Sequence, residues 1–267
     1  SIGLLQKLDS RYQLVDTYRN LLNSDHPESM VAMLTHLNKI KMTSGPQLIA
    51  KMTEGSFDNS MNFREPSFWS RSTSNLRAFH SSTSADFCAN LLQNLPQWKG
   101  VNKLLDIGAG TETLALKLLR TNAQLSVDLF DLPPVIEQIN LALTTKYSRL
   151  SLHAGDYNTT PLPKEFELIF ASMSLYYANS LPKIFTRIHQ SLSSDGIFVS
   201  LHEGLKKSRT EPWYHVIGRL LPSIQGNNVS FNEGEIAQQL LLSGFRQVHS
   251  SEVETPFGPM TLDIGYK

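Results

Sequence analysis

The chain has 267 residues, and its 24 Lys and Arg balance its 24 Asp and Glu, so the formal net charge is zero. That balance argues against a general nucleic-acid binder, which needs a basic excess on at least one face. No apolar run approaches the ~18–20 residues of a membrane span, and the first residues lack a secretory signal pattern. The single cysteine, Cys88, excludes an intrachain disulfide, and no zinc-ligand spacing occurs. We therefore expect a soluble, cytoplasmic globular protein with no metal site.

Residues 1–75 are predicted to form helices, turns and a linker. Apolar residues at helical spacing predict a short helix over 29–37, and a Gly-Pro break precedes a second one over 47–52. Residues 53–75 are polar and rich in Ser and Asn, which indicates an irregular linker or lid. The chain opens abruptly without Met, so we expect further sequence upstream of it.

Residues 76–267 alternate between helix and strand patterns, which predicts βαβ units around a parallel sheet. The predicted strands cover 103–107, 124–130, 150–154, 168–172 and 197–201, and the predicted helices cover 84–95, 113–120, 134–143, 181–192, 211–221 and 233–243. Two final strands, 245–253 and 260–266, have no helix between them and predict an antiparallel hairpin at the sheet edge. The fold class is therefore α/β, a Rossmann-like doubly wound domain.

A carboxylate stands at the end of each of three successive predicted strands. Asp106 precedes the turn made by Gly108 and Gly110, where glycine lets the backbone come close to a ligand. Asp131 follows the second strand and could accept both hydroxyls of an adenosine ribose. Asp156 follows the third strand and could meet the exocyclic amine of adenine. Each residue alone could be an ordinary turn or loop residue, but the ordered set indicates a nucleoside site.

The glycine loop departs from the dinucleotide pattern, because Thr113 stands where a third glycine is expected. That departure disfavours a nicotinamide-dependent reductase, whose helix N-terminus approaches a pyrophosphate closely. A nucleoside without phosphates fits better, and the acidic lining suits a cationic cofactor. S-adenosylmethionine carries a sulfonium and an ammonium, which carboxylates such as Asp106 attract.

The segments 105–111 (LDIGAGT), 130–136 (FDLPPVI) and 155–157 (GDY) closely resemble the small-molecule O-methyltransferases of the caffeate, hydroxyneurosporene and acetylserotonin type. Segments 231–235 and 242–245 resemble the late helix and turn of that family, and 9–14 resembles the wing of its N-terminal dimerisation domain.

The resemblance implies a class I methyltransferase domain over 76–267, with a partial helical, winged-helix dimerisation region and linker over 1–75. It implies a homodimer that binds S-adenosylmethionine, releases S-adenosylhomocysteine and acts on a small molecule, with no nucleic-acid or membrane partner. The positions implied to bind the cofactor are Asp106, Gly108, Gly110, Asp131, Leu132, Asp156, Tyr157 and Ser172.

Two residues depart from the family pattern. Glu112 stands where members usually have a third glycine, and it could either complement the dipole of the following helix or disturb the cofactor. Tyr176 stands where the family has the histidine that deprotonates the substrate. A phenol with an unperturbed pKa near 10 is a poor general base at neutral pH.

Candidate substitutes for that base are His202 and Glu203 after the strand 197–201, His215 on the helix expected to cover the substrate, and Tyr176 itself. His80 falls near the place where the family's linker meets the cofactor. A lone histidine is more often a hydrogen-bonded structural residue than a base.

The sequence therefore predicts S-adenosylmethionine-dependent methyl transfer, most simply O-methylation, to a small aromatic or natural-product-like molecule. A substrate with an acidic phenol would need no strong protein base. The second interpretation is a family descendant that no longer methylates and instead binds the cofactor or acts as a dimeric binding or regulatory protein.

Overall fold

A computed structural model of the chain describes residues 4–26, 29–31, 34–35, 49–50, 53–54, 66–224 and 228–267. Of the helices predicted over 29–37 and 47–52, the structure describes residues 29–31, 34–35 and 49–50, and 31, 34–35 and 49–50 are helical; the other residues of both lie outside the described ranges. Within the described ranges, no helix combines the length and the apolar character needed to cross a membrane.

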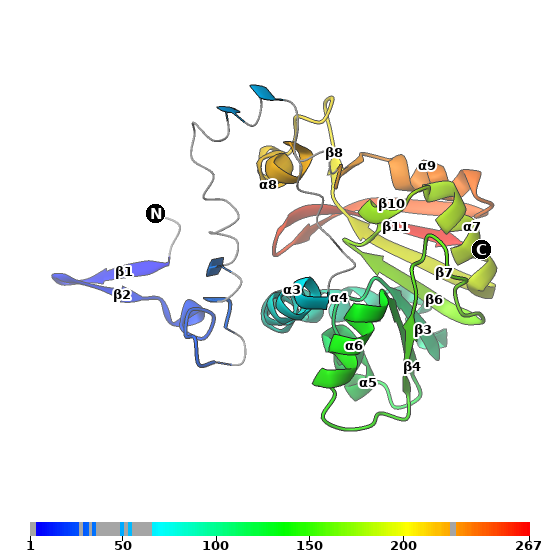
Figure 1. Ribbon diagram of the computed structural model, residues 1–267, viewed down its shortest axis with the longest axis horizontal. Helices are drawn as coiled ribbons and strands as arrows, with labels where there is room; N and C mark the ends of the chain where they lie inside the picture. Colours follow the sequence, from blue (N-terminus) through cyan, green and yellow to red (C-terminus); the bar gives the residue numbers. More distant parts are fainter. Residues whose placement is uncertain are drawn as a thin grey trace.

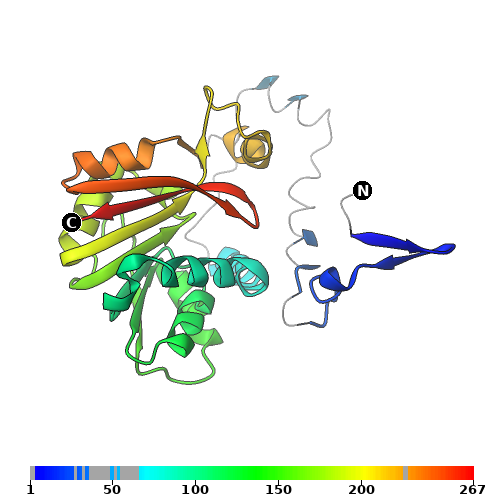
Figure 2. The same ribbon diagram turned by 180° about the vertical axis from the view of Figure 1, so that it is seen from behind.

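The N-terminal residues form an antiparallel hairpin of β1 (Leu5–Leu8) and β2 (Arg11–Leu14), followed by a 3-10 turn, η1 (Asp16–Tyr18). The turn of the hairpin includes Asp9 in the left-handed region, with φ of 54°. The hairpin includes residues 9–14, the segment whose sequence resembles the wing of the O-methyltransferase dimerisation domain. It lies apart from the larger α/β body (Figures 1 and 2).

The body is built on a seven-stranded sheet of order β10-β11-β7-β6-β3-β4-β5. Its strands are β3 (Lys103–Ile107), β4 (Ser126–Asp131), β5 (Leu150–Ala154), β6 (Phe166–Ser172), β7 (Leu192–His202), β10 (Gln247–Thr255) and β11 (Gly258–Tyr266). The strands from β3 to β7 are parallel, and the β10–β11 hairpin adds to β7 antiparallel, as predicted. The chain runs outward from β3 to β5 and then crosses to β6 on the other side of β3. Ligands bind at the carboxyl ends of strands at such a switch point.

Helices cover both faces of the sheet (Figure 1). They are α4 (Ala85–Gln93), α5 (Thr113–Thr121) and α6 (Pro133–Ala142) on one face, and α7 (Leu181–Ser191) and α9 (Glu235–Leu242) on the other. Successive residues of β3 point to opposite faces, so Leu104 joins the first core and Leu105 the second. The predicted α/β architecture is confirmed.

The prediction of an irregular segment over 53–75 is wrong for its last ten residues. They begin α3 (Pro66–Phe79), which continues through a π-helical turn, η2 (His80–Ser84), into α4. The segment is rich in serine, a residue of modest helix propensity, so the local sequence does not indicate a helix. Contacts with α6 and with the loop after β3 supply the stabilisation that propensity lacks. Residue 75, the end of the first predicted domain, falls inside α3.

Short elements complete the body. They are η3 (Pro96–Gly100), η4 (Leu175–Tyr177), β8 (Gly204–Leu205), α8 (Trp213–Ile224) and β9 (Phe231–Asn232). Strand β8 follows β7 and leads to α8, and β9 follows α8. The two short strands pair with each other. Both η4 and α8 lie at the edge of the sheet where the parallel strands end.

Candidate active site

The loop after β3 makes two left-handed turns that glycine permits at little cost. Gly108 has φ of 70° and Gly110 has φ of 66°. A Cβ atom at Gly108 would lie 2.5 Å from Cβ of Ser174, so no side chain fits there. A Cβ at Gly110 would lie 3.4 Å from Leu76 and so would fill the narrow space between the loop and α3. The loop therefore keeps its backbone open toward the cavity beside it.

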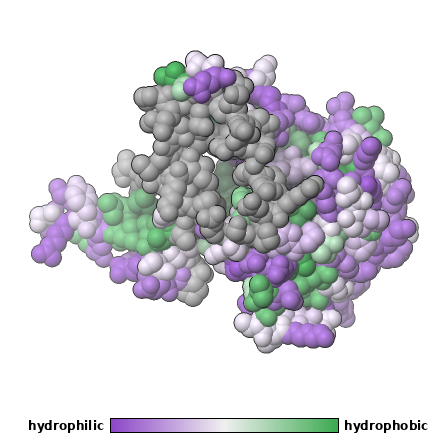
Figure 3. All heavy atoms as spheres, in the orientation of Figure 1, coloured by the Kyte–Doolittle hydropathy of each residue, from purple (hydrophilic) through white to green (hydrophobic). Residues whose placement is uncertain are grey.

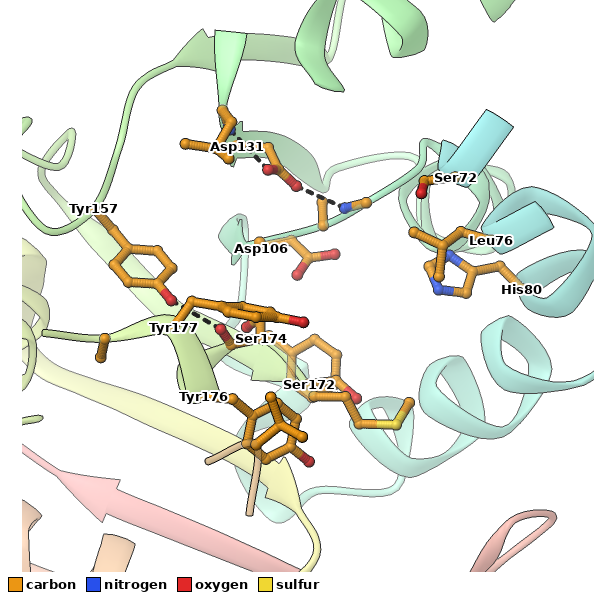
Figure 4. A pocket seen from close by; sticks show the side chains of 18 of the residues that line it. Ser72, Leu76, His80, Asp106, Asp131, Tyr157, Ser172, Ser174, Tyr176 and Tyr177 are labelled. Atoms are coloured by element: carbon orange, nitrogen blue, oxygen red, sulfur yellow. Dashed lines mark hydrogen bonds between the residues drawn. The ribbon is translucent and has the colours of Figure 1, made fainter. Parts of the chain in front are cut away.

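Asp131 ends β4 and holds this loop in place. Its Oδ2 accepts a hydrogen bond of 2.8 Å from the Gly110 amide, and its Oδ1 accepts one of 2.7 Å from the Leu132 amide. Each carboxylate oxygen has a second lone pair available for a ligand hydroxyl. Figure 4 shows Asp131 and Asp106 directed into the same cavity.

The cavity at the carboxyl ends of the parallel strands has a volume of about 1160 Å³. All eight residues predicted to bind the cofactor line it: Asp106, Gly108, Gly110, Asp131, Leu132, Asp156, Tyr157 and Ser172. Parallel strands deliver the residues that follow them to one edge of a sheet, which explains why segments far apart in sequence meet here.

Two buried carboxylates give the cavity a preference for positive charge. Burial and, to a smaller extent, the nearby Asp131 charge raise the pKa of Asp106 to about 7. Burial also raises the pKa of Asp131 to about 6, while the hydrogen bonds from Gly110 and Leu132 act in the opposite direction. A cationic group bound beside them would favour their ionised forms.

Asp156 and Tyr157 have local partners as well as positions in the cavity wall. Asp156 Oδ1 accepts hydrogen bonds from the backbone and side-chain amides of Asn158, at 2.8 and 3.0 Å. The Tyr157 hydroxyl donates to the Ser174 carbonyl at 2.8 Å. These contacts hold the loop after β5 in place and fix the Tyr157 ring in the cavity wall.

Helix α3 and turn η2 form a wall of the cavity that the sequence analysis did not anticipate, apart from His80. The wall includes Phe68, Trp69, Ser72, Asn75, Leu76, Phe79 and His80. The Nδ1 atom of His80 lies 2.7 Å from Oγ1 of Thr111, whose own hydroxyl donates to Thr113. His80 is therefore the donor in this contact and is neutral. Burial lowers its pKa to about 4.

Glu112, the residue that departs from the family pattern, does not line the cavity. It pairs with Arg77 of α3, through contacts of 2.6 Å from Nε to Oε1 and 3.0 Å from Nη2 to Oε2. The Glu112 side chain is 7% exposed and that of Arg77 is 31% exposed. The carboxylate therefore joins α3 to the cofactor loop, a two-pronged pairing that favours arginine over lysine.

We expect Arg77→Met to lower the free energy of unfolding by about 2–3 kcal/mol, because it leaves the Glu112 carboxylate buried without its partner. The double variant Arg77→Met/Glu112→Gln should recover part of that loss. Urea unfolding followed by circular dichroism measures both. A double variant that is less stable than Arg77→Met would contradict the assignment.

The five residues considered for the base are placed differently. Tyr176, on η4, lines the cavity, and its hydroxyl donates to Oε2 of Glu203. Glu203 follows β7, is 1% exposed and pairs with Arg219 of α8, whose Nε lies 2.7 Å from Oε1. His80 lines the cavity beside the cofactor loop, as described above.

His202 and His215 are not brought to the cavity wall. Nε2 of His202 accepts two backbone hydrogen bonds of 3.2 Å, from Ser174 and Leu175, and burial lowers its pKa to about 3. His215 contacts the Pro259 carbonyl of β11, with Nε2 at 2.9 Å. Both rings are therefore engaged with neighbouring backbone and lie outside the cavity lining. The cysteine, Cys88, is buried in α4 against the same cavity.

Arg219, which lines the cavity, was missed by sequence reasoning. It lies 16 residues from Glu203, and no local pattern pairs the two. Among the described residues, no group of three or more His, Cys, Asp or Glu side chains is arranged to hold a metal ion.

Comparisons with known proteins agree with this geometry. Residues 79–250 match a family model described as a methyltransferase domain. Over 262 residues the chain is 23% identical to a human probable bifunctional dTTP/UTP pyrophosphatase/methyltransferase protein, covering 93% of this chain and 42% of that one. Over 189 residues it is 25% identical to 3-hydroxy-5-methyl-1-naphthoate 3-O-methyltransferase of Streptomyces sahachiroi, covering 66% and 52%. The chain thus spans about half the length, or less, of these relatives.

The fold is also similar to that of solved structures. Human N-acetylserotonin methyltransferase in complex with SAM (S-adenosylmethionine) superposes with a TM-score of 0.78 at 16% identity. The match covers 99% of this chain and 79% of that chain. The Rossmann-like class I fold of the α/β body is therefore shared with this structure.

Proposed function

Because the chain belongs to the methyltransferase domain family, we propose that it transfers a methyl group from S-adenosylmethionine to an oxygen atom of a small aromatic molecule. One observation carries the proposal. The three carboxylates at or just after the ends of β3, β4 and β5 line a single cavity beside the glycine loop.

The residues present fit this cofactor. The Asp131 carboxylate has free lone pairs for the ribose hydroxyls, and its two backbone hydrogen bonds hold it in position. Asp106 supplies a buried negative charge for the ammonium, and Asp156 stands where the adenine amine is expected. The glycine loop brings backbone without side chains to the wall of the same cavity, at Gly108 and Gly110. When bound, the cofactor supplies a sulfonium methyl group for in-line displacement.

The rest of the cavity suits a small aromatic substrate. Beyond the carboxylates, its walls carry the rings of Phe68, Trp69, Tyr176 and Tyr177, together with Arg219. Aromatic walls favour flat ring systems through stacking and edge contacts. The activities named for the naphthoate and acetylserotonin enzymes support the same substrate class.

The position of Glu112 weighs against the non-methylating alternative. That interpretation arose from the concern that a carboxylate in the glycine loop disturbs the cofactor. Pairing with Arg77 keeps the Glu112 charge out of the cavity wall.

We further propose that the chain forms a homodimer through its N-terminal region, 1–75, and that the catalytic cavity is formed by 76–267 together with the part of α3 that precedes residue 76. The exposed apolar residues of the hairpin support this, since Leu5 is 54% and Tyr12 is 70% exposed. A cytoplasmic location stays a prediction from the sequence.

The direct test is formation of S-adenosylhomocysteine by the purified chain, with S-adenosylmethionine and a panel of naphthols, catechols and hydroxyindoles. Methylated product identified by mass spectrometry, in equal amount to S-adenosylhomocysteine, supports O-methyl transfer. Tight cofactor binding with no turnover on any panel member would favour the non-methylating alternative.

Affinity for S-adenosylmethionine should rise as pH rises from 5.5 to 7.5. Asp106 and Asp131 have pKa values raised to about 7 and about 6, so at low pH they are protonated and cannot pair with a cation. Each proton released on binding makes the affinity change by up to about tenfold per pH unit. Calorimetric titration across this range measures the effect, and Asp106→Asn should flatten its upper part. A dissociation constant independent of pH would contradict the assignment.

A further inference from the structure

Three residues from different elements meet at the aromatic part of the cavity wall. Tyr176 comes from η4, Glu203 follows β7, and Arg219 comes from α8. Tyr176 and Arg219 face the cavity, whereas Glu203 lies behind them at 1% exposure. In the view of Figure 4, Tyr176 and Asp131 lie on opposite sides of Asp106, which separates this cluster from the ribose-binding carboxylate.

Tyr176 is held rigidly in this position. Its ring stacks on Phe231, with centroids 5.1 Å apart and planes 23° apart, and meets the edge of His202 at 5.2 Å. The Arg219 guanidinium lies over the Tyr176 ring, with Cζ 5.2 Å from the ring centroid. The Tyr176 hydroxyl donates its proton to Glu203, and its oxygen accepts from the Glu203 backbone amide, which leaves one lone pair to accept a further hydrogen bond.

The charges of the cluster determine which way a proton can move. Burial alone would raise the pKa of Glu203, but Arg219 and the Tyr176 hydroxyl bring it below its usual value, so Glu203 is ionised. Burial and the Glu203 charge hold the pKa of Tyr176 well above its usual value. Tyr176 therefore keeps its proton and cannot act alone as a base, although it can pass a proton on.

On the basis of the proposed function, we propose that Tyr176 relays the proton of the substrate hydroxyl to Glu203. The substrate O–H proton moves to the Tyr176 oxygen as the tyrosine's own proton moves to Glu203. The substrate oxygen keeps the electron pair and forms its bond to the methyl carbon, while the pair of the breaking carbon–sulfur bond stays on sulfur. The sulfonium and the carboxylate both become neutral, so charge balances.

The cluster also narrows the substrate class. Pairing with Arg219 makes Glu203 a weak proton acceptor, so the relay works best for hydroxyls that give up their proton readily. Phenols made acidic by a carbonyl, carboxyl or nitro substituent on the ring are the substrates that it favours. Arg219 in this account is a positioning residue that sets the basicity of Glu203.

The first test compares Tyr176→Phe and Glu203→Gln with wild type, using the phenol of the panel that wild type methylates fastest. Loss of a positioned proton acceptor lowers kcat by about 10²–10⁴-fold, with smaller changes in KM. The loss should shrink when an electron-withdrawing group makes the same phenol more acidic. Tyr147→Phe, a tyrosine outside the cavity lining, is the matched control and should leave kcat unchanged.

The second test needs no turnover. In the chain bound to S-adenosylhomocysteine, 2-naphthol should bind more tightly than 2-methoxynaphthalene, because only its hydroxyl can donate to Tyr176. Tyr176→Phe should abolish that difference without changing the affinity for S-adenosylhomocysteine. Retained cofactor affinity also shows that each variant is folded.

The third test follows the ionisation of Glu203. Its titratable neighbours are Arg219 from α8, Tyr176 from η4, and His202 and Asp263 in the sheet. In Arg219→Gln, the acid limb of the kcat profile and the carboxyl carbon-13 titration of Glu203 should both move to higher pH.

The outcomes separate the relay from the proposed function. If wild type forms no S-adenosylhomocysteine with any phenol, the proposed function fails and the relay fails with it. If wild type turns over but Tyr176→Phe and Glu203→Gln leave kcat and the naphthol preference unchanged, the relay alone is wrong.

Discussion

Replacing Asp131 with alanine is expected to lower the affinity for S-adenosylmethionine by a factor of about 100 or more. The variant loses the acceptor for both ribose hydroxyls, and a hydrogen bond to a charged group contributes about 1.5–3 kcal/mol. It also leaves the amides of Gly110 and Leu132 without their partner, which loosens the loop that faces the methionine end. Calorimetric titration of wild type and variant measures the change.

Asp195→Ala is the matched control, since the Asp195 side chain is 98% exposed and lies outside the cavity lining. Its affinity should equal that of wild type. A folded Asp131→Ala variant that binds S-adenosylmethionine as tightly as wild type would show that the ribose is held elsewhere.

Replacing Gly108 with alanine should lower the free energy of unfolding by roughly 3 kcal/mol. The left-handed conformation alone costs an alanine about 1–2 kcal/mol. The added Cβ would also meet Cβ of Ser174 at 2.5 Å, and relieving such overpacking costs about 1–3 kcal/mol. Because Ser174 Oγ donates to the Ile107 carbonyl, the displacement would also pull on the end of β3.

Gly218→Ala is the contrasting control. Gly218 lies in α8 with no heavy atom within 4 Å of an added Cβ, so alanine there should stabilise the chain by about 0.5–1 kcal/mol. Denaturant unfolding compares the two variants. If Gly108→Ala were as stable as Gly218→Ala, the loop would not have the backbone conformation described here.

The cofactor side of the cavity could be predicted from the sequence because its determinants are local. Buried strands such as β3 are mostly apolar in sequence, and the glycines and carboxylates at their ends are neighbours in the chain. Parallel pairing then brings Asp106, Asp131 and Asp156 to one edge without further information. All eight residues predicted from this pattern line the cavity.

The opposite walls depend on contacts between distant residues and could not be predicted. Helix α3 has a serine-rich sequence, and its stabilising ion pair joins Arg77 to Glu112, 35 residues away. From the sequence, Glu112 was a departure from the family with two opposed interpretations. The structure adds a third role, the pairing with Arg77, which depends on the position of α3.

The part of the cavity expected to hold the substrate also depends on contacts between distant residues. His202 follows a strand at the correct edge of the sheet, yet its ring nitrogens are used by Ser200 and by the amides of the turn before η4. The sequence therefore named both His202 and Glu203 at this edge, but it could not tell which of the two side chains contacts the Tyr176 hydroxyl. The pairing of Glu203 with Arg219 depends on how α8 packs, which no local pattern encodes.

The central claim is that the cavity holds S-adenosylmethionine, and calorimetric titration of the full chain with S-adenosylmethionine and S-adenosylhomocysteine at pH 7.5 tests it most directly. We expect micromolar binding of both compounds, at one site per chain. Absence of binding heat for either compound, in a sample shown to be folded by circular dichroism, would contradict it.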